Sequence, residues 1–406
     1  MEQQLRRLSE IPVLGVCFAA CATALWIGGC SGDKGTSADA ETGTPVSLCS
    51  DAPGSICTWA GTGRPGWEGD GQPLLLSKFY WPVDVTVTTA GETYILDWNN
   101  HRVRQVMPDE TLLTVIGSDF VGDGPYDESD QVLPGALGTT VLLNHPTQIL
   151  PLPDGSLLLT AWHNHKLRTY DPVTGLVMVI CGAGAGFEGD GGQAREALLS
   201  QPSQTVLGPD GGLYILDQRN QRVRRIGPDG IITTVVGTGV AGFSGDGGPP
   251  LQAQIQLPAG SNPSPAGGLA FGPDGRLYIS DSLNNRIRVV DFDNDTIDTF
   301  AGTGERGFSG DDGTALSAAF DNPRDLLFAS DGRLYVADEL NHRIRAIDPG
   351  TGIITTVAGN GVPAFAGDGG AAVAASLNRP AGIEEDRLGR LIIADTYNHR
   401  IRRVNL

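Results

Sequence analysis

Residues 323–358 read PRDLLFASDGRLYVADELNHRIRAIDPGTGIITTVA and show the pattern of most of the chain. Short apolar runs alternate there with turn-forming Asp, Gly, Asn and Pro residues, which is typical of strands joined by tight turns. The second run, LYVA, is apolar throughout and fits a strand covered on both faces. The third, RIRAI, sends arginines to one face and isoleucines to the other. The stretch therefore predicts four antiparallel strands, at 323–328, 333–337, 343–347 and 353–358.

One segment of this stretch, Asp-x-x-Asn-x-Arg-Ile-Arg beginning at Asp338, recurs along the chain. A degenerate copy begins at Ala161, and the other four copies begin at Asp97, Asp217, Asp281 and Asp395. Successive copies are 56 to 64 residues apart. Repeats of this length are typical of arrays or propellers, and four strands in each of six copies predict a six-bladed propeller.

The two ends of the chain indicate that the ring closes. The sixth copy stops at residue 406, after its third strand, and its missing fourth strand matches ICTWAGTG at 56–63. An amino-terminal strand in the last blade would leave no unpaired end blade. An open solenoid would instead need caps at both ends. We therefore predict an all-β, six-bladed β-propeller of four-stranded antiparallel blades over residues 51–406, closed by that strand.

The repeated unit resembles the NHL repeat, and the resemblance covers residues 56–406. The matching triplets are Asn341-His342-Arg343 and Asn398-His399-Arg400. Gluconolactonase and regucalcin-like proteins, amidating lyases and the NHL domains of teneurins share this six-bladed style. Because their functions differ widely, the resemblance implies a shape and leaves the activity open.

The first thirty residues have the features of an export signal. Arg6 and Arg7 precede an uncharged stretch at 11–29, with small residues before Cys30. Ile27-Gly28-Gly29-Cys30 resembles the lipobox of bacterial lipoproteins, in which the cysteine is lipidated, and Cys21 is a second candidate. An uncleaved membrane anchor is the alternative, since nineteen residues can span a bilayer. We expect a lipoprotein signal peptide at 1–29 and a protein anchored by lipid to the cell envelope.

The segment that follows Cys30 is small and polar. Because residues 30–50 have few groups that could form a core, we interpret them as a flexible tether. Two or more acyl chains on Cys30 would hold the protein stably at a membrane. Cys49 and Cys57 lie eight residues apart, and in an exported protein they are expected to form a disulfide. Cys181, within an apolar run, is expected to be a small buried side chain.

Composition excludes some partners. The chain has 406 residues with a formal charge of −19, 57 Gly and 26 Pro, which argues against a helical protein. A strongly anionic surface repels phosphate backbones, so no nucleic-acid partner is expected. Contact with a membrane is expected through the lipid anchor alone, and we expect a monomer.

The repeated polar residues are interpreted as structural. Each repeated aspartate can accept backbone N–H bonds at its hairpin, where the Asn tolerates left-handed geometry, and its loss at Ala161 should cost about 1 kcal/mol. The paired arginines could form a stripe that binds an acidic ligand, but they are expected to meet the aspartates of the Gly-Asp-Gly segments or neighbouring hairpins in pairs between blades. Those aspartates are also placed to cap short helical turns: Asp190, Asp246, Asp311 and Asp368. Four histidines share one repeat position, which disfavours a catalytic role for any of them: His101, His165, His342 and His399.

Positions that differ between copies carry more information about function. Two residues after the proline that opens each innermost strand, the side chains vary and should lie near one mouth of the central channel. Four of them form a loose oxygen-rich set that could contact a ligand or a divalent metal ion such as Ca²⁺: Asp84, Gln148, Gln204 and Asp325. Related propeller hydrolases hold a divalent ion in this channel, although no His or Glu joins the set here as an acid or base.

A second, weaker calcium candidate is the acidic run Asp291, Asp293 and Asp295. Its alternating carboxylates resemble a calcium loop, but Thr296 stands where glycine is required and Gly302 where glutamate is required. No firm cofactor follows from the sequence. Irregular loops at 118–140 and 258–265 interrupt the repeat, and such loops on a rigid ring are where partners usually bind.

These observations favour a binding or interaction scaffold at the bacterial cell envelope. Its partner would be a protein or a small molecule on a propeller face. The alternative is a divalent-metal-dependent lactonase or lyase with its site in the channel. A third interpretation is a structural envelope protein with no discrete ligand.

Overall fold

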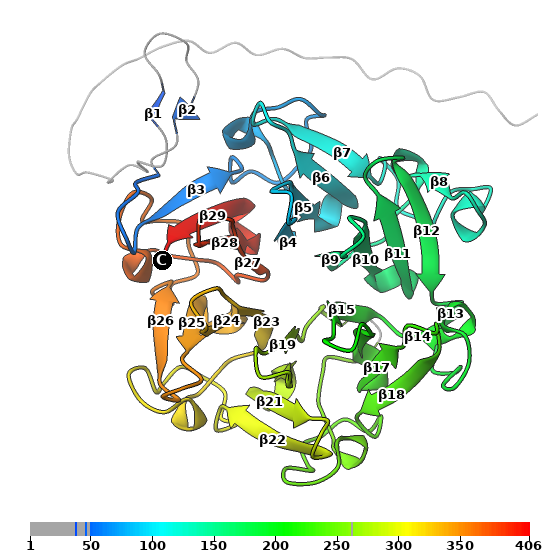
Figure 1. Cartoon of the computed structure of the whole chain (residues 1–406). Helices are drawn as coiled ribbons and strands as arrows, with labels where there is room; N and C mark the ends of the chain where they lie inside the picture. Colours follow the sequence, from blue (N-terminus) through cyan, green and yellow to red (C-terminus); the bar gives the residue numbers. More distant parts are fainter. Residues whose placement is uncertain (1–36, 39–44, 47–48, 261–262) are drawn as a thin grey trace, which may run out of the picture. The chain divides into compact units, whose positions relative to one another are not determined.

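A computed structural model describes residues 37–38, 45–46, 49–260 and 263–406. Cys21, Cys30, the predicted signal segment and most of the predicted tether lie outside these residues. Within the described part, six antiparallel sheets are arranged in a ring (Figure 1), and the innermost strands of all six line a space at its centre, the central channel. The fold is the predicted six-bladed β-propeller. No helix among the described residues has the length and apolar character needed to cross a membrane.

Each blade is ordered from the channel outward, in the sequence order of its strands. Blade 1 contains β4 (Pro82–Val87), β5 (Thr93–Asp97), β6 (Arg102–Val106) and β7 (Leu112–Ile116). Blade 2 contains β9 (Gln148–Pro151), β10 (Leu157–Ala161), β11 (Lys166–Asp171) and β12 (Leu176–Cys181). Blade 3 contains β15 (Pro202–Leu207), β16 (Leu213–Asp217), β17 (Arg222–Ile226) and β18 (Ile232–Val236).

The remaining blades repeat the arrangement. Blade 4 contains β19 (Leu269–Phe271), β20 (Leu277–Asp281), β21 (Arg286–Asp291) and β22 (Thr296–Ala301). Blade 5 contains β23 (Pro323–Phe328), β24 (Leu334–Asp338), β25 (Arg343–Ile347) and β26 (Ile354–Ala358). Blade 6 contains β27 (Ile383–Glu385), β28 (Arg390–Asp395), β29 (Arg400–Asn405) and β3 (Ile56–Ala60).

The ring closes as predicted, because β3 is the outer strand of the last blade. It pairs antiparallel with β29, with Ile56 opposite Val404 and Ala60 opposite Ile401. In Figure 1 the blue β3 lies beside the red β29, so strands from opposite ends of the chain share one sheet. Cys49 and Cys57 form a disulfide that ties the segment before β3 to the strand itself.

Apolar side chains fill the spaces between blades. Among the described residues, six clusters of buried side chains occur, one at each interface between neighbouring blades. The cluster between blades 6 and 1 joins Ala60, Ile401 and Ile95. Burial on both faces of the second strands follows from this packing, as the apolar run at 333–337 predicts. Cys181 is fully buried, and burial raises the pKa of its thiol to about 12.

A buried arginine on the third strand of each blade anchors the incoming connection. The guanidinium of Arg224 lies 2.7 Å from Asp190, which also accepts a bond from the hydroxyl of Thr234. Equivalent pairs confirm the predicted contact with Gly-Asp-Gly aspartates for the second arginine of the repeat: Arg288–Asp246, Arg345–Asp311 and Arg402–Asp368. Each of these arginines is fully buried, so its charge requires such a partner. The first arginine of the repeat, such as Arg222, donates to backbone carbonyls instead.

The expectation that these aspartates cap helical turns is wrong. The turns that follow them are single 3₁₀ turns, and none has a side-chain cap: η6 (Ala194–Glu196), η8 (Pro250–Gln252), η10 (Ala315–Ser317) and η12 (Ala372–Ala374). The arginine attracts the carboxylate instead, because a buried guanidinium is a stronger partner than a backbone N–H group.

The repeated hairpin aspartates accept backbone bonds from the loop that enters their own blade. Asp97 accepts the N–H of Tyr80 at 2.7 Å and the side-chain amide of Asn100 at 2.8 Å. The left-handed residue is the one after this Asn, not the Asn itself, since His101 has φ 54°. The prediction of a structural role therefore has a definite geometry, with the left-handed position shifted by one residue.

The residue that follows the repeated Asn, such as His101 or His399, links neighbouring blades through its side chain. His399 Nδ1 of blade 6 accepts the backbone N–H of Trp81 in blade 1 at 3.3 Å. The same bond occurs at the other five interfaces, with Gln221 and Asn285 replacing histidine in blades 3 and 4: His101–His145, His165–Gln201, Gln221–Leu257, Asn285–Asn322 and His342–Arg379. This repeat position therefore has a structural use in all six blades.

Candidate functional site

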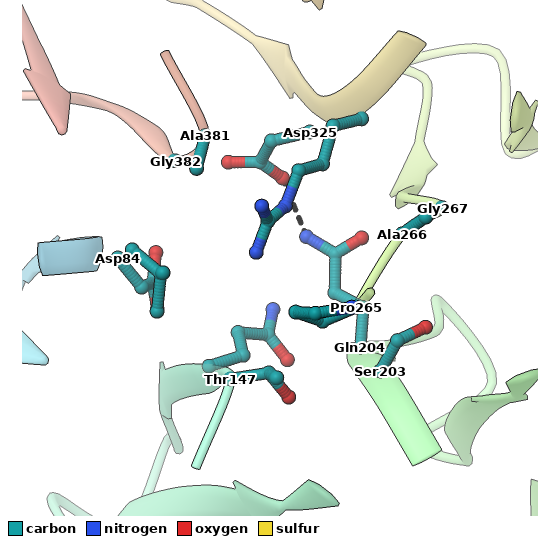
Figure 2. A pocket seen from close by; sticks show the side chains of 13 residues that line it. Asp84, Thr147, Ser203, Gln204, Pro265, Ala266, Gly267, Asp325, Ala381 and Gly382 are labelled. Atoms are coloured by element: carbon teal, nitrogen blue, oxygen red, sulfur yellow. Dashed lines mark hydrogen bonds between the residues drawn. The ribbon is translucent and has the colours of Figure 1, made fainter. Parts of the chain in front are cut away.

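The four predicted channel residues also bridge neighbouring blades. Asp84 Oδ2 accepts the N–H of Ile149 at 2.7 Å, and Gln148 Oε1 accepts that of Thr205 at 2.6 Å. Gln204 and Asp325 bond in the same way to Leu269 and Ile383, and the Gln204 amide also donates to Asp325 (Figure 2). Each side chain thus reaches the innermost strand of the next blade.

Glycines occupy the equivalent position in the other two blades. A Cβ atom at Gly268 would lie 2.2 Å from the carbonyl oxygen of Arg324, and one at Gly382 would lie 2.6 Å from that of Val83. Neither position has room for a side chain without a shift of backbone, so these two interfaces pack backbone directly against backbone.

Burial dominates the electrostatics of the six channel positions, which we call the channel ring. It raises the pKa of Asp84 well above its usual value, and the nearby Asp325 and Glu384 raise it further. Burial also raises the pKa of Asp325, and that of Glu384 to about 7. These carboxyl groups hold protons more readily than exposed ones, and among the described residues no three acidic, His or Cys side chains gather as a metal site. The geometry fits links between blades, and metal binding here stays a prediction.

A larger pocket, which the sequence did not predict, opens beside this ring. Its volume is about 330 Å³, and Val83, Pro265 and Arg324 belong both to its lining and to that of the narrow space within the ring. We call it the mouth pocket. Its main side chains come from the positions just before and after the opening prolines, and from the turns after the hairpin aspartates. Residues from blades 1, 2, 4, 5 and 6 therefore meet there.

Aromatic rings form one side of the mouth pocket. Trp81 stacks on Tyr397 of blade 6 with ring centroids 5.1 Å apart, and lies 6.0 Å from Trp98. Trp98 continues the contact to Trp162 of blade 2, whose ring stacks on His163 at 4.0 Å. Closure of the propeller is what brings Tyr397 and Trp81 together, because they come from blades 6 and 1.

Two histidines extend this arc in a hydrogen-bonded pair. The Nδ1 atoms of His145 and His163 lie 2.9 Å apart, and His145 Nε2 lies 3.1 Å from the side-chain oxygen of Asn99. Burial lowers the pKa of His145 to about 3 and that of His163 to about 4. Both rings are therefore neutral at pH 7, and they add polar edges to an otherwise aromatic wall.

Charged groups from blades 5 and 6 line the pocket next to Tyr397. Glu339 pairs with Arg379 at 2.9 Å and accepts a bond from Asn322 at 2.6 Å. Arg379 also donates to the hydroxyl of Tyr397 at 3.0 Å. Its donors are thus directed at protein groups, and the pair contributes no net charge to the pocket.

Arg324 differs from the other arginines of the interior. It lines both the mouth pocket and the narrow space within the ring. No carboxylate oxygen of the described residues lies within 4.0 Å of its guanidinium, and no hydrogen bond joins its side chain to them. Burial lowers its pKa, while Glu339 and then Asp325 raise it from a greater distance.

A signal for Arg324 was present in the sequence. One residue after the opening proline or its equivalent, the six copies carry Val83, Thr147, Ser203, Gly267, Arg324 and Ala381. A single charged residue in this series marks a departure from the repeat. The polar side chains at the next position along the chain bond to neighbouring strands instead.

The other predicted sites occupy different places. Asp291 lies in a hairpin, where its carboxylate accepts the N–H of Asn294 at 3.0 Å and the amide of the same residue at 2.9 Å. Asp291 and Asp293 line a separate pocket of about 500 Å³. Calcium binding by Asp291, Asp293 and Asp295 stays a prediction.

The two irregular loops lie in different parts of the propeller, and only the 258–265 loop reaches the mouth pocket. Pro263, Ser264 and Pro265 of the 258–265 loop line the mouth pocket, and the carbonyls of Pro258 and Ser264 accept bonds from Gln218 at 2.9 Å. The 118–140 segment lies instead at the outer edge of blade 2, where β8 (Ala136–Leu137) pairs with β12. It retains a Gly-Asp-Gly segment, and its Asp123 bonds to the buried Arg168 at 2.6 Å.

The chain is similar in sequence to known repeat proteins, although no family model matches it. It is 31% identical over 255 residues to the chloroplast protein SUPPRESSOR OF QUENCHING 1 of Arabidopsis thaliana, over 60% of this chain and 23% of that protein. It is 25% identical to chicken NHL repeat-containing protein 2 over 81% of this chain and 47% of that protein. Mouse teneurin-1 is 26% identical over 53% of this chain and 8% of its own length.

Solved structures share the fold. A Bacteroides thetaiotaomicron protein of unknown function has a TM-score of 0.62 at 18% identity, over 86% of this chain and 75% of that one. An auxiliary nutrient binding protein of the same species has a TM-score of 0.59 at 19% identity, with the same coverage. This chain spans less than half of each curated relative described above, so the likeness concerns the repeat region. The chain is a six-bladed β-propeller whose repeats are similar to those of NHL repeat-containing protein 2 and teneurin-1.

Proposed function

We propose that this chain is an exported, lipid-anchored binding protein that holds a small molecule in the mouth pocket. The observation that carries the proposal is the pocket itself, which is lined by both aromatic rings and charged groups. Its volume of about 330 Å³ lies at the lower end of the range for small-molecule sites. A few directed polar groups among aromatic faces are the usual composition of such sites.

The surroundings hold the pocket in shape before a ligand arrives. Trp81, His145 and Arg379 each donate a backbone N–H to the Nδ1 atom of a histidine in the preceding blade. The same three residues line the pocket, so its walls are attached to three different interfaces between blades. A preformed pocket spares a ligand the cost of ordering these side chains.

Two sequence features support the cellular location. Cys30 follows a basic and then apolar stretch that resembles a lipoprotein signal. The disulfide between Cys49 and Cys57 is of the kind that persists in oxidising compartments outside the cytosol. Metabolic labelling with palmitate, repeated with Cys30→Ala and Cys21→Ala, tests the anchor.

The nutrient-binding role in the name of the second Bacteroides structure is compatible with small-molecule binding. Binding is tested by a ligand-observed NMR screen of small cyclic metabolites against the propeller. Compounds bound in the mouth pocket should lose their signal changes when Trp81 and Tyr397 are both replaced by Leu. Replacement of Tyr126, which is 91% exposed on the 118–140 segment, is the control. Ligands that are insensitive to the pocket variant and sensitive to the control would contradict the proposal and favour the outer segment.

A further inference from the structure

We infer that the ligand of the mouth pocket is a small monocarboxylate, with its carboxylate on Arg324 and a ring against Trp81 and Tyr397. This inference rests on the proposed function and names the class of ligand. Six fully buried arginines of the third strands each have at least one charged or carbonyl partner, whereas Arg324 has neither a hydrogen bond nor an ion pair with the described residues.

A partly buried cation without a partner is unfavourable. Removing a charge from water costs free energy that only a nearby opposite charge or hydrogen-bond acceptors can offset. Arg324 presents five N–H donors in a planar fork that matches the two oxygens of a carboxylate. The channel thus holds an unused donor set directed at the space that the pocket leaves open.

The charge of the surroundings favours a single negative charge on the ligand. Glu339 and Arg379 neutralise each other, which leaves Arg324 as the uncompensated group on this side. Asp84 and Asp325 lie in the ring beneath, and burial raises the pKa of both. Further negative charge from a phosphate monoester would meet these carboxyl groups, so a carboxylate fits better.

The aromatic side defines the rest of the ligand. Tyr397 is 37% exposed, and it stacks on Trp81 at the pocket. Flat or apolar ring faces gain about 0.5–1.5 kcal/mol from such contacts beyond the area they bury. The limited volume excludes long polymers and leaves room for one ring with a short carboxylate arm.

Isothermal titration calorimetry at pH 7 tests this class with matched probes. Phenylacetate and its uncharged analogue phenylacetamide have the same ring and differ in charge. Because a charge-assisted bond contributes about 1.5–3 kcal/mol, phenylacetate should bind about 10- to 100-fold more tightly. Galacturonate and phenyl phosphate are additional probes, which separate a sugar acid and a phosphate from an aromatic acid.

The variants locate the effect. Arg324→Gln should reduce the ratio of the two affinities to nearly one, and Arg324→Lys should restore part of it. Arg276→Gln is the matched control, since Arg276 pairs with Asp274 beside the separate acidic pocket and should leave the ratio unchanged. Thermal unfolding of each variant shows whether the fold is retained.

Several outcomes overturn the inference. Equal binding of acid and amide, an unchanged ratio in Arg324→Gln, or tighter binding of phenyl phosphate would each contradict it. So would the absence of binding by both carboxylates up to about 10 mM, which corresponds to about −2.7 kcal/mol. If acid and amide bind equally and both lose binding in the Trp81 and Tyr397 variant, the proposed function is preserved and only the ligand class is rejected.

Discussion

The side-chain oxygen of Asn164 accepts the backbone N–H of Asn144 at 3.1 Å, a bond that an aspartate makes in the other five blades. Blade 2 lacks that aspartate, because Ala161 stands in its place. The missing charge is also replaced, since the buried Asp130 of the 118–140 segment bonds to Arg168 at 3.1 Å. The 118–140 segment thus supplies, through Asp130, the negative charge that blade 2 lacks at Ala161.

This compensation makes Asn164 more important than its counterparts. Asn164→Ala should lower the free energy of unfolding by about 2–3 kcal/mol, since it removes partners of the Asn144 N–H and the Gly122 carbonyl. Adding Ala161→Asp should recover about 1 kcal/mol by restoring the usual acceptor. Urea unfolding measures both. Asn294→Ala, in an exposed hairpin, is the control, and a cost at Asn164 below about 0.5 kcal/mol would refute the interpretation.

The pair between Asp311 and Arg345 should behave as a buried ion pair. Asp311→Ala removes the closer of the two carboxylates that contact the fully buried Arg345, leaving Asp338 at 3.6 Å, and should cost about 2–4 kcal/mol. The double change with Arg345→Met should cost less than the sum, with a coupling of about 1–3 kcal/mol. The exposed pair Arg276–Asp274 should show a coupling of about 0–1 kcal/mol in the same double-mutant cycle. Equal couplings would contradict the assigned role.

The strands could be predicted from sequence almost residue by residue. The fifth copy predicts strands at 343–347 and 353–358, and the structure has Arg343–Ile347 and Ile354–Ala358. This accuracy follows from repetition, since six copies of one apolar pattern leave few alternative registers. Closure of the propeller by the segment at 56–63 could also be predicted, because the fourth strand missing from the sixth copy has a matching sequence near the amino terminus.

The candidate site was only partly accessible from the sequence. The positions of Asp84 and Asp325 suggested a channel site, yet whether a polar side chain faces open space or a neighbouring N–H depends on the distance between blades. Arg324, one residue before Asp325, could have been noticed as a departure from the repeat. The stacking of Trp81 on Tyr397 could not, because it requires the geometry of the closed ring.

The histidine links should make stability depend on pH. Burial lowers the pKa of His101 to about 4 from 6.5, so the unfolded chain binds a proton more readily between these values. This contribution is therefore present above about pH 6.5 and is lost as the pH falls towards 4. His101→Gln keeps an acceptor, as Gln221 does in blade 3. Between pH 7 and 5, the variant should lose about 1–2 kcal/mol less than the wild type.

Comparison with the variant is required because buried carboxyl groups act in the opposite sense. Burial raises the pKa of Asp217 and Asp338 to about 7 from 3.8, so their contribution is present at low pH and is lost as the pH rises through 7. Urea unfolding at both pH values measures the difference between wild type and variant. If the two proteins lose the same free energy, His101 does not titrate as described.

Ring closure should matter more than the disulfide beside it. Replacing Cys49 and Cys57 by Ser removes a short cross-link and should cost about 2–3 kcal/mol, with cooperative unfolding retained. A chain that begins at Arg64 lacks β3 and the buried Ile56 and Ala60, so it should lose cooperative unfolding altogether. Calorimetry distinguishes the two. A truncated chain that still unfolds in one transition would show that the sixth blade is complete without β3.

The most direct test of ligand binding in the mouth pocket is ¹⁹F NMR of the protein labelled with 5-fluorotryptophan, titrated with phenylacetate. Single Trp→Phe variants assign the resonances. Trp81 and Trp98 line the pocket, whereas Trp67 packs against Arg102 and Arg104 away from it. The predicted result is saturable shifts at Trp81 and Trp98 with Trp67 unchanged, and loss of these shifts in Arg324→Gln. Shifts at Trp67 with Trp81 and Trp98 unchanged would contradict the account.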